Sequence, residues 1–187
     1  MPNVLQPRTA EELLRMPSDD YRYELVKGEL RKITPAGSRH GSIITRLLSA
    51  LVQHVDVLTL GEVFGPDTGF KIAEAPDTVR APDIAFVSME RIPAGELNEQ
   101  FWPGAPDLAV EVISPTDTLY ELDEKIEEYM ASGVALVWAV NPKRRTVTVY
   151  RPGASAEVLD ENDQLDGRPV LPAFQYPIAK LFEVKRR

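Results

Sequence analysis

The sequence predicts an α/β (α+β) fold in which helices flank a central mixed β-sheet. Two amphipathic helical patterns are separated by several short apolar stretches of strand length, and sixteen prolines keep the elements short. An apolar stretch at 108–114, a helical pattern at 119–131 and an apolar run at 134–140 follow in the order strand, helix, strand. That order is typical of a right-handed crossover between parallel strands. The 187 residues are expected to form a single domain, residues 1–187.

The strongest helical pattern covers residues 40–55, where apolar residues recur at i, i+3 and i+4 and form one stripe. The second helix covers 119–131. It is preceded by Thr118, and Glu121 stands three residues later, which is the spacing of a capping box. Shorter helices are predicted near each end of the chain, over residues 8–16 and 179–184.

Apolar stretches bounded by Gly, Pro and Asp predict the strands. The first two surround Lys27-Gly28, a pair suited to a hairpin turn, and the run at 134–140 lacks polar alternation, as in a strand buried on both faces. The predicted strands cover residues 23–26, 29–34, 62–64, 69–73, 83–88, 108–114, 134–140 and 146–150. Residues 166–177 are predicted to be mostly loop.

Composition excludes several classes of function. The chain has no cysteine, which excludes disulfides, thiolate metal sites and a cysteine nucleophile. Its two histidines, His40 and His54, are too few for a His-rich zinc site, and no Gly-x-Gly-x-x-Gly, P-loop or Gly-x-Ser-x-Gly motif is present. No apolar run reaches the roughly 18 residues of a membrane span, and the first residues lack the pattern of a secretory signal. No membrane partner and a cytoplasmic location are therefore expected.

Charge is distributed unevenly along the chain. The net charge of −8 argues against a protein that coats nucleic acid or binds a membrane surface. Residues 22–46, however, hold six basic residues and two acidic ones, whereas residues 117–128 hold six acidic residues and one lysine. Either block can be a solvated face, and the basic block can also contact nucleic acid locally.

Two carboxylates in apolar strands are the main candidates for chemistry. Glu111 lies within the stretch 108–114, and Asp83 opens the strand 84–87. On neighbouring strands their side chains can approach within about 5 Å, which suits Mg²⁺ or Mn²⁺. Glu24, in the opening hairpin, is a third candidate. The alternatives are a solvent-facing side of the sheet for Glu111, a turn acid for Asp83 and a surface acid for Glu24.

These residues stand in segments that resemble the Uma family of restriction endonucleases, within the PD-(D/E)XK nuclease superfamily. The matching segments keep their order over nearly the whole chain: Tyr23-Glu-Leu-Val-Lys-Gly-Glu-Leu30, Ser38-Arg-His-Gly41, Ala81-Pro-Asp-Ile-Ala-Phe-Val87, Ala105-Pro-Asp-Leu-Ala-Val-Glu-Val-Ile-Ser-Pro115, Asp123-Glu-Lys125, Tyr129, Gly133 and Trp138-Ala-Val-Asn-Pro142. The resemblance implies a restriction-endonuclease-like fold and metal-dependent hydrolysis of phosphodiester bonds in DNA.

The resemblance also implies a role for each acid. Asp83 and Glu111 would bind Mg²⁺ (or Mn²⁺), and Glu24 would be an accessory acid at the same centre. A bound ion of this kind polarises the phosphate and lowers the pKa of bound water.

The superfamily pattern has a lysine two residues after the position of Glu111, where this chain has Ile113. The resemblance points to Lys125, on the following helix, as the replacement. We expect the Lys125 ammonium within about 6 Å of the Glu111 carboxylate, where opposite charges favour each other's ionised forms. The alternative is a surface ion pair one helical turn away, with Glu121 or Glu128.

Basic residues of the hairpin and the next loop are candidates for contacts with the DNA backbone, namely Lys27, Arg31, Lys32 and Arg39. His40 is a candidate phosphate or active-site contact, or alternatively a satisfied histidine at the start of a buried stripe. A homodimer is a further expectation, because enzymes that cut duplex DNA often pair two sites by two-fold symmetry.

Two other functions stay open. One is a catalytically inactive nuclease-fold module that binds nucleic acid or regulates a partner, which Ile113 and the acidic net charge favour. The other is a two-carboxylate hydrolase acting on sugars, and the aromatic content of 7% argues against its aromatic-lined cleft.

Overall fold

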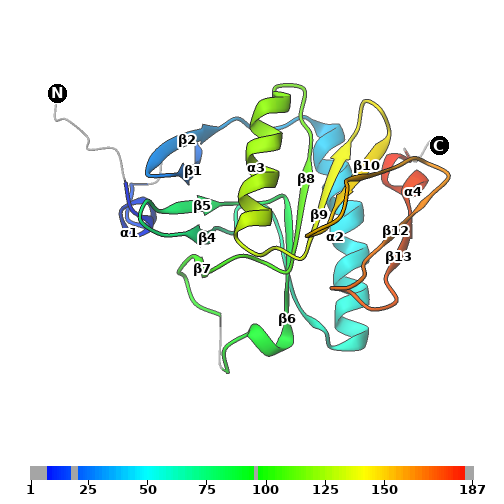
Figure 1. The fold of residues 1–187 in the computed structure, drawn as a ribbon, viewed down its shortest axis with the longest axis horizontal. Coiled ribbons are helices and arrows are strands. Elements are labelled where there is room, and N and C mark those ends of the chain that lie inside the picture. Colours follow the sequence, from blue (N-terminus) through cyan, green and yellow to red (C-terminus); the bar gives the residue numbers. More distant parts are fainter. Residues whose placement is uncertain (1–7, 18–20, 95–96, 184–187) are drawn as a thin grey trace.

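Two β-sheets form the framework of the computed structural model, which describes residues 8–17, 21–94 and 97–183. The five-stranded sheet has the order β2 (Glu29–Ile33), β1 (Arg22–Val26), β5 (Thr78–Arg80), β4 (Phe70–Ala73), β7 (Trp102–Pro103). The six-stranded sheet has the order β11 (Glu157–Leu159), β10 (Thr146–Tyr150), β9 (Leu136–Asn141), β8 (Leu108–Val112), β6 (Ile84–Ser88), β3 (Gly61–Phe64). Figure 1 shows the first sheet near the N-terminus and the second toward the C-terminus.

The remaining elements in the described ranges are four helices, a 3₁₀ turn and a small two-stranded sheet. They are α1 (Ala10–Leu14), α2 (Ser38–Leu58), η1 (Met89–Arg91), α3 (Leu119–Ala131), α4 (Ile178–Phe182), β12 (Gln164–Asp166) and β13 (Gln175–Pro177). Within the described ranges, no helix is both long and apolar enough to span a membrane.

The predicted mixed α/β fold is confirmed, and its crossover is present as predicted: α3 connects β8 to β9, and these two strands pair in parallel. The prediction of one central sheet is incomplete, since the hairpin of β1 and β2 belongs to a second sheet. The loop predicted at 166–177 is also partly wrong, because β12 and β13 lie at its ends.

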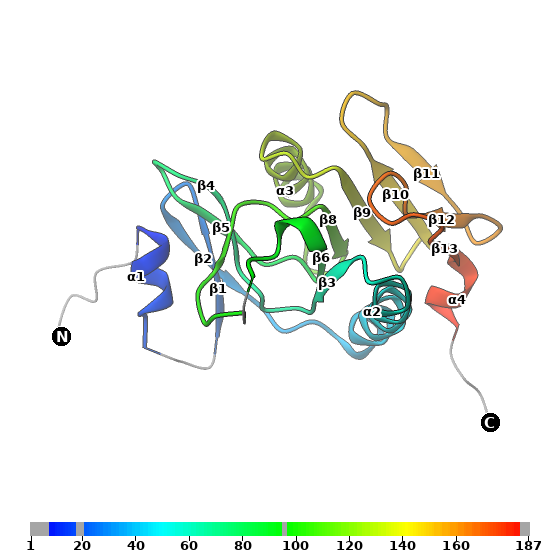
Figure 2. The same cartoon turned by 90° about the horizontal axis from the view of Figure 1, so that it is seen from below.

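The six-stranded sheet is covered by α2 on one face and α3 on the other (Figure 2). Residues alternate along a strand, so Leu108, Val110 and Val112 of β8 pack with α2. Ala109 faces the opposite way and packs with Ile126 and Tyr129 of α3. Glu111 shares the α3 face with Ala109, two residues earlier in the strand.

The start of α3 follows directly from its sequence. The Thr118 hydroxyl accepts a hydrogen bond from the Glu121 N–H, and the Glu121 carboxylate accepts one from the Thr118 N–H. The hairpin turn at Lys27 and Gly28 has both residues in the left-handed region, at φ 51° and 76°, as a tight turn between twisted strands requires. These two local structures set the hairpin and α3 on either side of a polar interior.

Candidate active site

Glu111 lies in the centre of the six-stranded sheet and is only 7% exposed. The Tyr129 hydroxyl donates a 2.7 Å hydrogen bond to its Oε1, and the Lys125 ammonium donates a 3.2 Å hydrogen bond to its Oε2. The alternative of a solvent-facing Glu111 is therefore wrong. Burial raises the pKa of Glu111 to about 7, against the positive charge of Lys125 and together with the negative charge of Asp83.

Asp83 immediately precedes β6, which pairs with β8 so that Ile84 lies opposite Val110. Continuing this antiparallel register by one residue sets Asp83 opposite Glu111. The Asp83 Oδ2 accepts a 2.7 Å hydrogen bond from the Val112 N–H, next to Glu111 in the strand. The two acids thus sit on neighbouring strands, as predicted, and their negative charges interact.

His40 reaches the same place from the first turn of α2. Its Nε2 lies 3.2 Å from the Asp83 Oδ2, and its side chain is half-buried. This hydrogen bond raises the pKa of His40, although burial acts in the opposite direction. The contact with Asp83 agrees with both interpretations of His40: the histidine has a hydrogen-bond partner, and that partner is an acid of the candidate site.

Glu24 is 2% exposed, so the alternative of a surface acid is wrong. Its Oε2 accepts a 2.7 Å hydrogen bond from Arg80 Nη1, and its Oε1 accepts one of 3.1 Å from the Ala81 N–H. The Lys125 ammonium lies 3.5 Å from the same Oε1. Burial raises the pKa of Glu24, but the charges of Lys125 and Arg80 outweigh it and hold that pKa below its usual range.

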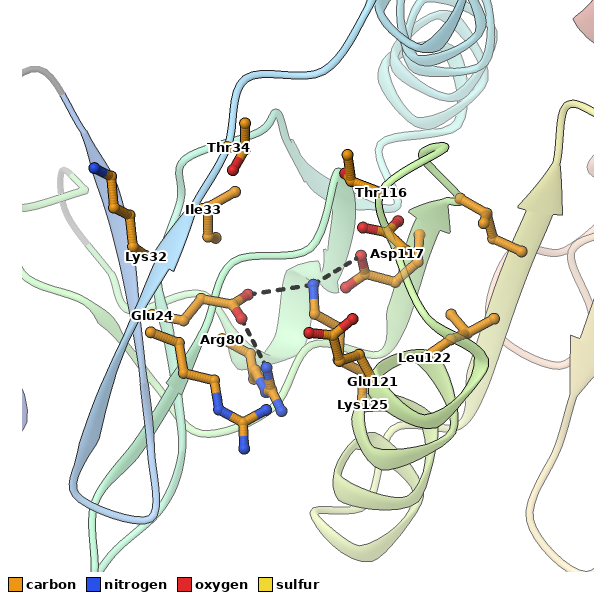
Figure 3. A pocket seen from close by; sticks show the side chains of 13 residues that line it. Glu24, Lys32, Ile33, Thr34, Arg80, Thr116, Asp117, Glu121, Leu122 and Lys125 are labelled. Carbon is orange, nitrogen blue, oxygen red and sulfur yellow. Dashed lines mark hydrogen bonds and ion pairs between the residues drawn. The ribbon is translucent and has the colours of Figure 1, made fainter.

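Lys125 therefore lies between two buried carboxylates, Glu24 and Glu111, and not against Glu121 or Glu128 as in the surface alternative. The distance of 3.2 Å to Glu111 is within the predicted limit of about 6 Å. Burial disfavours the charged ammonium, yet the two carboxylates more than compensate and raise the pKa of Lys125 above its ordinary value. Figure 3 shows Glu24 between Arg80 and Lys125, with a dashed line to each.

Two adjoining cavities, of about 210 and 290 Å³, open on either side of Lys125 and Glu111. Arg31 and Arg80 line the smaller cavity, while Asp83 and His40 line the larger one. Both share wall residues from the end of β2, from β8, from the β8–α3 loop and from α3, namely Ile33, Thr34, Glu111, Asp117 and Lys125. A phosphate group that entered between the two cavities would lie next to the Lys125 ammonium and the carboxylates of Asp83 and Glu111.

The basic candidates are not gathered into one open surface. Lys27 lies 3.7 Å from Glu124 and 3.5 Å from Glu128 of α3, and Arg31 pairs with both oxygens of Glu124. Lys32 lies over the Tyr21 ring. Arg39, in the first turn of α2, is exposed.

Two residues in the site were not predicted from the sequence. Tyr129 stands among the segments that carry the family resemblance, but no role at the site is predicted for it, although it follows Lys125 by four residues and so shares its helix face. Arg80 was not singled out, because arginine is usually exposed. Its place three residues before Asp83 was the available signal.

The acids present fit a hard divalent cation. Within the described residues no three His, Asp or Glu side chains form a metal-binding cluster. Asp83 and Glu111, on neighbouring strands, both line the larger cavity. Mg²⁺ is commonly held by one or two carboxylates, with water and substrate phosphates filling the other positions. A cation would also compensate the negative charge of the buried Glu111 carboxylate, whose pKa is raised by burial.

A family model with the description "Putative restriction endonuclease", Uma2, matches residues 10–179. Among solved structures, the chain is similar to a crystal structure described as "a putative nuclease belonging to DUF820" from Anabaena variabilis ATCC 29413. The two chains share 25% sequence identity with a TM-score of 0.83, over 94% of this chain and 98% of the other. No curated protein matches.

Both comparisons support a nuclease. The family model spans most of the chain, and the structural similarity covers 94% of it. The chain belongs to the Uma2 family, which is described as "Putative restriction endonuclease".

Proposed function

We propose that this protein is a metal-dependent DNA endonuclease that hydrolyses phosphodiester bonds at the site formed by Asp83, Glu111 and Lys125. The observation that supports this most strongly is the half-buried Lys125 side chain, whose ammonium lies 3.2 Å from Glu111 beside two cavities. It supplies the positive charge that Ile113 cannot. The catalytically inactive alternative is favoured by that apolar residue and by the acidic net charge, and a lysine from α3 weakens the first of these two arguments.

Asp83 and Glu111 would hold the cation, which would polarise the phosphate and lower the pKa of a bound water. Mg²⁺ fits this pair, and Mn²⁺ prefers the same oxygen ligands. Tyr129 and Lys125 orient the Glu111 carboxylate by binding one oxygen each. The Val112 N–H orients Asp83 in the same way.

A lysine at such a site can either accept a proton from water or stabilise negative charge, and we assign only the second role to Lys125. Because the carboxylates raise its pKa above the ordinary value, the side chain stays protonated at neutral pH and cannot accept a proton from water. It acts as a fixed positive charge that stabilises negative charge developing on the phosphate. Glu24 holds this charge in place from the other side.

DNA is the proposed substrate, and the proposed backbone contacts come from basic residues near the cavities. Arg39 is exposed beside His40, at the start of α2, and Lys32 lies on the edge strand β2. Lys27 and Arg31 already pair with acids of α3, which compensate part of the positive charge that would otherwise attract DNA phosphates. A homodimer remains a proposal that follows from duplex cleavage alone.

The test is cleavage of supercoiled and linear DNA by the purified protein with Mg²⁺, Mn²⁺ or a chelator. We expect cleavage only with a divalent cation, and its loss in Asp83→Asn and Glu111→Gln. Calorimetry with Mn²⁺ should show binding by the native protein and none by Asp83→Asn. Asp107→Asn is the matched control, since Asp107 also follows a proline but pairs with Arg91. Metal binding without cleavage of any DNA would favour the inactive module.

A further inference from the structure

Arg80 is 1% exposed, and the chemistry proposed above does not use it. It ends β5, a central strand of the five-stranded sheet, three residues before Asp83. A guanidinium in such a place is costly to desolvate, so its partners must compensate it closely. Those partners come from two other elements, β1 and α3.

The contacts of Arg80 are specific at each nitrogen. Nη1 donates a 2.7 Å hydrogen bond to Glu24 of β1, and Nε donates one of 2.8 Å to Glu128 of α3. Nη2 also lies 2.8 Å from the Glu128 carboxylate. Glu128 follows Lys125 by three residues and so shares its helix face. Through these contacts Arg80 holds α3 near Lys125, and it also holds Glu24, the acid that Lys125 contacts.

The position of the Lys125 ammonium depends on this arrangement. Arg80 binds Oε2 of Glu24, while the Ala81 N–H and Lys125 lie at Oε1. The ammonium lies 3.2 Å from Glu111 and 3.5 Å from Glu24, whose charge the guanidinium also compensates. Two positive charges around one carboxylate also repel each other, which favours the side of Lys125 that faces Glu111.

We infer that Arg80 is a positioning residue of the active site: by holding Glu24 and Glu128 it sets the place of the Lys125 ammonium against Glu111. This inference rests on the proposed function for its effect on cleavage. It predicts, independently of cleavage, that the Lys125 ammonium moves when Arg80 is changed. A purely structural Arg80 would contribute to stability and leave that ammonium where it is.

The experiment compares Arg80→Lys and Arg80→Met with the native protein by NMR of the lysine ammonium groups, after the Lys125 signal is identified by its loss in Lys125→Met. A Lys125 ammonium held between two buried carboxylates should give a shifted, slowly exchanging signal. We expect both Arg80 variants to displace or broaden it. Arg145→Met is the control, because it removes another arginine–carboxylate pair, with Glu161, in the turns that precede β10 and follow β11.

Cleavage kinetics supply the second measurement. Misplacement of a charged group by about 1 Å can lower a rate on the order of 100-fold, so Arg80→Lys should lower kcat to that degree with little change in KM. Lysine keeps the charge but cannot make the forked contacts of the guanidinium. If the Arg80 variants fail to fold, Glu128→Gln takes their place, because it removes only one partner of Arg80. We expect it to displace or broaden the Lys125 signal as well.

The outcomes separate the two ideas. Folded Arg80 variants with an unchanged Lys125 signal and an unchanged kcat would overturn the positioning role while leaving the nuclease intact. A native protein that cleaves no DNA would overturn the proposed function, and the Lys125 signal alone would then decide the role of Arg80.

Discussion

The two helices that cover the six-stranded sheet bury different kinds of side chain. On one face, α2 presents Ile43, Leu47 and Leu51 to a core that is apolar throughout. On the other, α3 buries Tyr129 beside Lys125, which is paired with carboxylates of two different strands. The first face gains free energy from apolar burial, and the second retains paired charges beside two cavities. Apolar burial thus dominates the α2 face, whereas the ion pairs of the proposed site lie on the α3 face, with His40 alone reaching Asp83 from the start of α2 among the contacts described.

The largest expected effect is on the α2 face. Leu51 is fully buried, and Leu51→Ala should lower the free energy of unfolding by about 2–5 kcal/mol through lost burial and a residual cavity. Urea unfolding measures this change. The exposed Val57 of the same helix is the control, since Val57→Ala should stay within about 0.5 kcal/mol. A large loss of Mn²⁺ affinity in folded Leu51→Ala would show that the two faces are not independent.

On the α3 face, Lys125→Met should lower the cleavage rate by about 100-fold or more while the protein stays folded. The methionine keeps the apolar stem but removes the charge beside Glu111. Single-turnover cleavage at saturating Mg²⁺ measures the effect. Lys143→Met, in the exposed turn between β9 and β10, should cleave like the native protein. Normal cleavage by Lys125→Met would rule out the relocated lysine.

Without metal, Glu111 should make the protein less stable as pH rises. Its pKa is about 7 in the folded state against an ordinary 4.5, so between these values the folded state binds more protons than the unfolded state. Stability should therefore fall by on the order of 3 kcal/mol from about pH 4.5 to 7, and Glu111→Gln should abolish this fall. Glu24 has the opposite sign, because its lowered pKa makes stability decline as pH falls.

Urea unfolding at about pH 5 and 8, in the presence of a chelator, checks this prediction. A native protein and a Glu111→Gln variant with the same dependence on pH would mean that burial does not disfavour the charged form of Glu111. Adding Mg²⁺ should restore much of the lost stability of the native protein, since a bound cation stabilises the folded state.

A smaller effect is expected for Tyr129→Phe, which removes one hydroxyl from a buried position. Loss of an outer hydrogen bond to a metal ligand commonly weakens metal affinity by about 10–100-fold. Calorimetric titration with Mn²⁺ measures the affinity. Tyr176→Phe removes a hydroxyl on the α2 side and should bind Mn²⁺ like the native protein. Equal affinities for all three proteins would exclude a role for Tyr129 in orienting Glu111.

The smallest effect concerns single contacts with DNA. Each phosphate contact contributes about 0.9 to the slope of log affinity against log salt, so Arg39→Ala should flatten the slope by roughly that amount. Arg31→Ala should flatten it less, because Glu124 already compensates that charge. Fluorescence anisotropy with metal-free protein and a salt series measures both slopes. Binding indifferent to salt would point to another partner.

The sequence predicted local structure better than pairing. The bounds of α3 agree with the prediction because its capping box and apolar spacing are local signals. The three-residue strand β5 was missed, since so short a segment has no visible period. Its neighbours in the sheet are β1 and β4, and nothing local indicates that β1 pairs with a strand about fifty residues away.

The residues of the candidate site divide in the same way, into those with a local signal in the sequence and those whose importance depends on distant contacts. Asp83 and Glu111 stood out because acids are unexpected in apolar strands, and Lys125 came from the family resemblance. Arg80 and Tyr129 could not be found in this way, because their importance lies in contacts between elements far apart in the sequence. The roles of all these side chains remain predictions.

The attachment of α3 has a consequence for recognising relatives of this chain. The face of α3 that carries Lys125 is attached to the two sheets through Glu128 and Tyr129, which bind Arg80 and Glu111 respectively. A loop can absorb an insertion, whereas one residue inserted within a helix turns the following side chains by about 100°. Nucleases built on this plan should therefore vary in the number of residues between the strand glutamate and the lysine. They should keep a lysine followed by a carboxylate three residues later and a tyrosine four residues later.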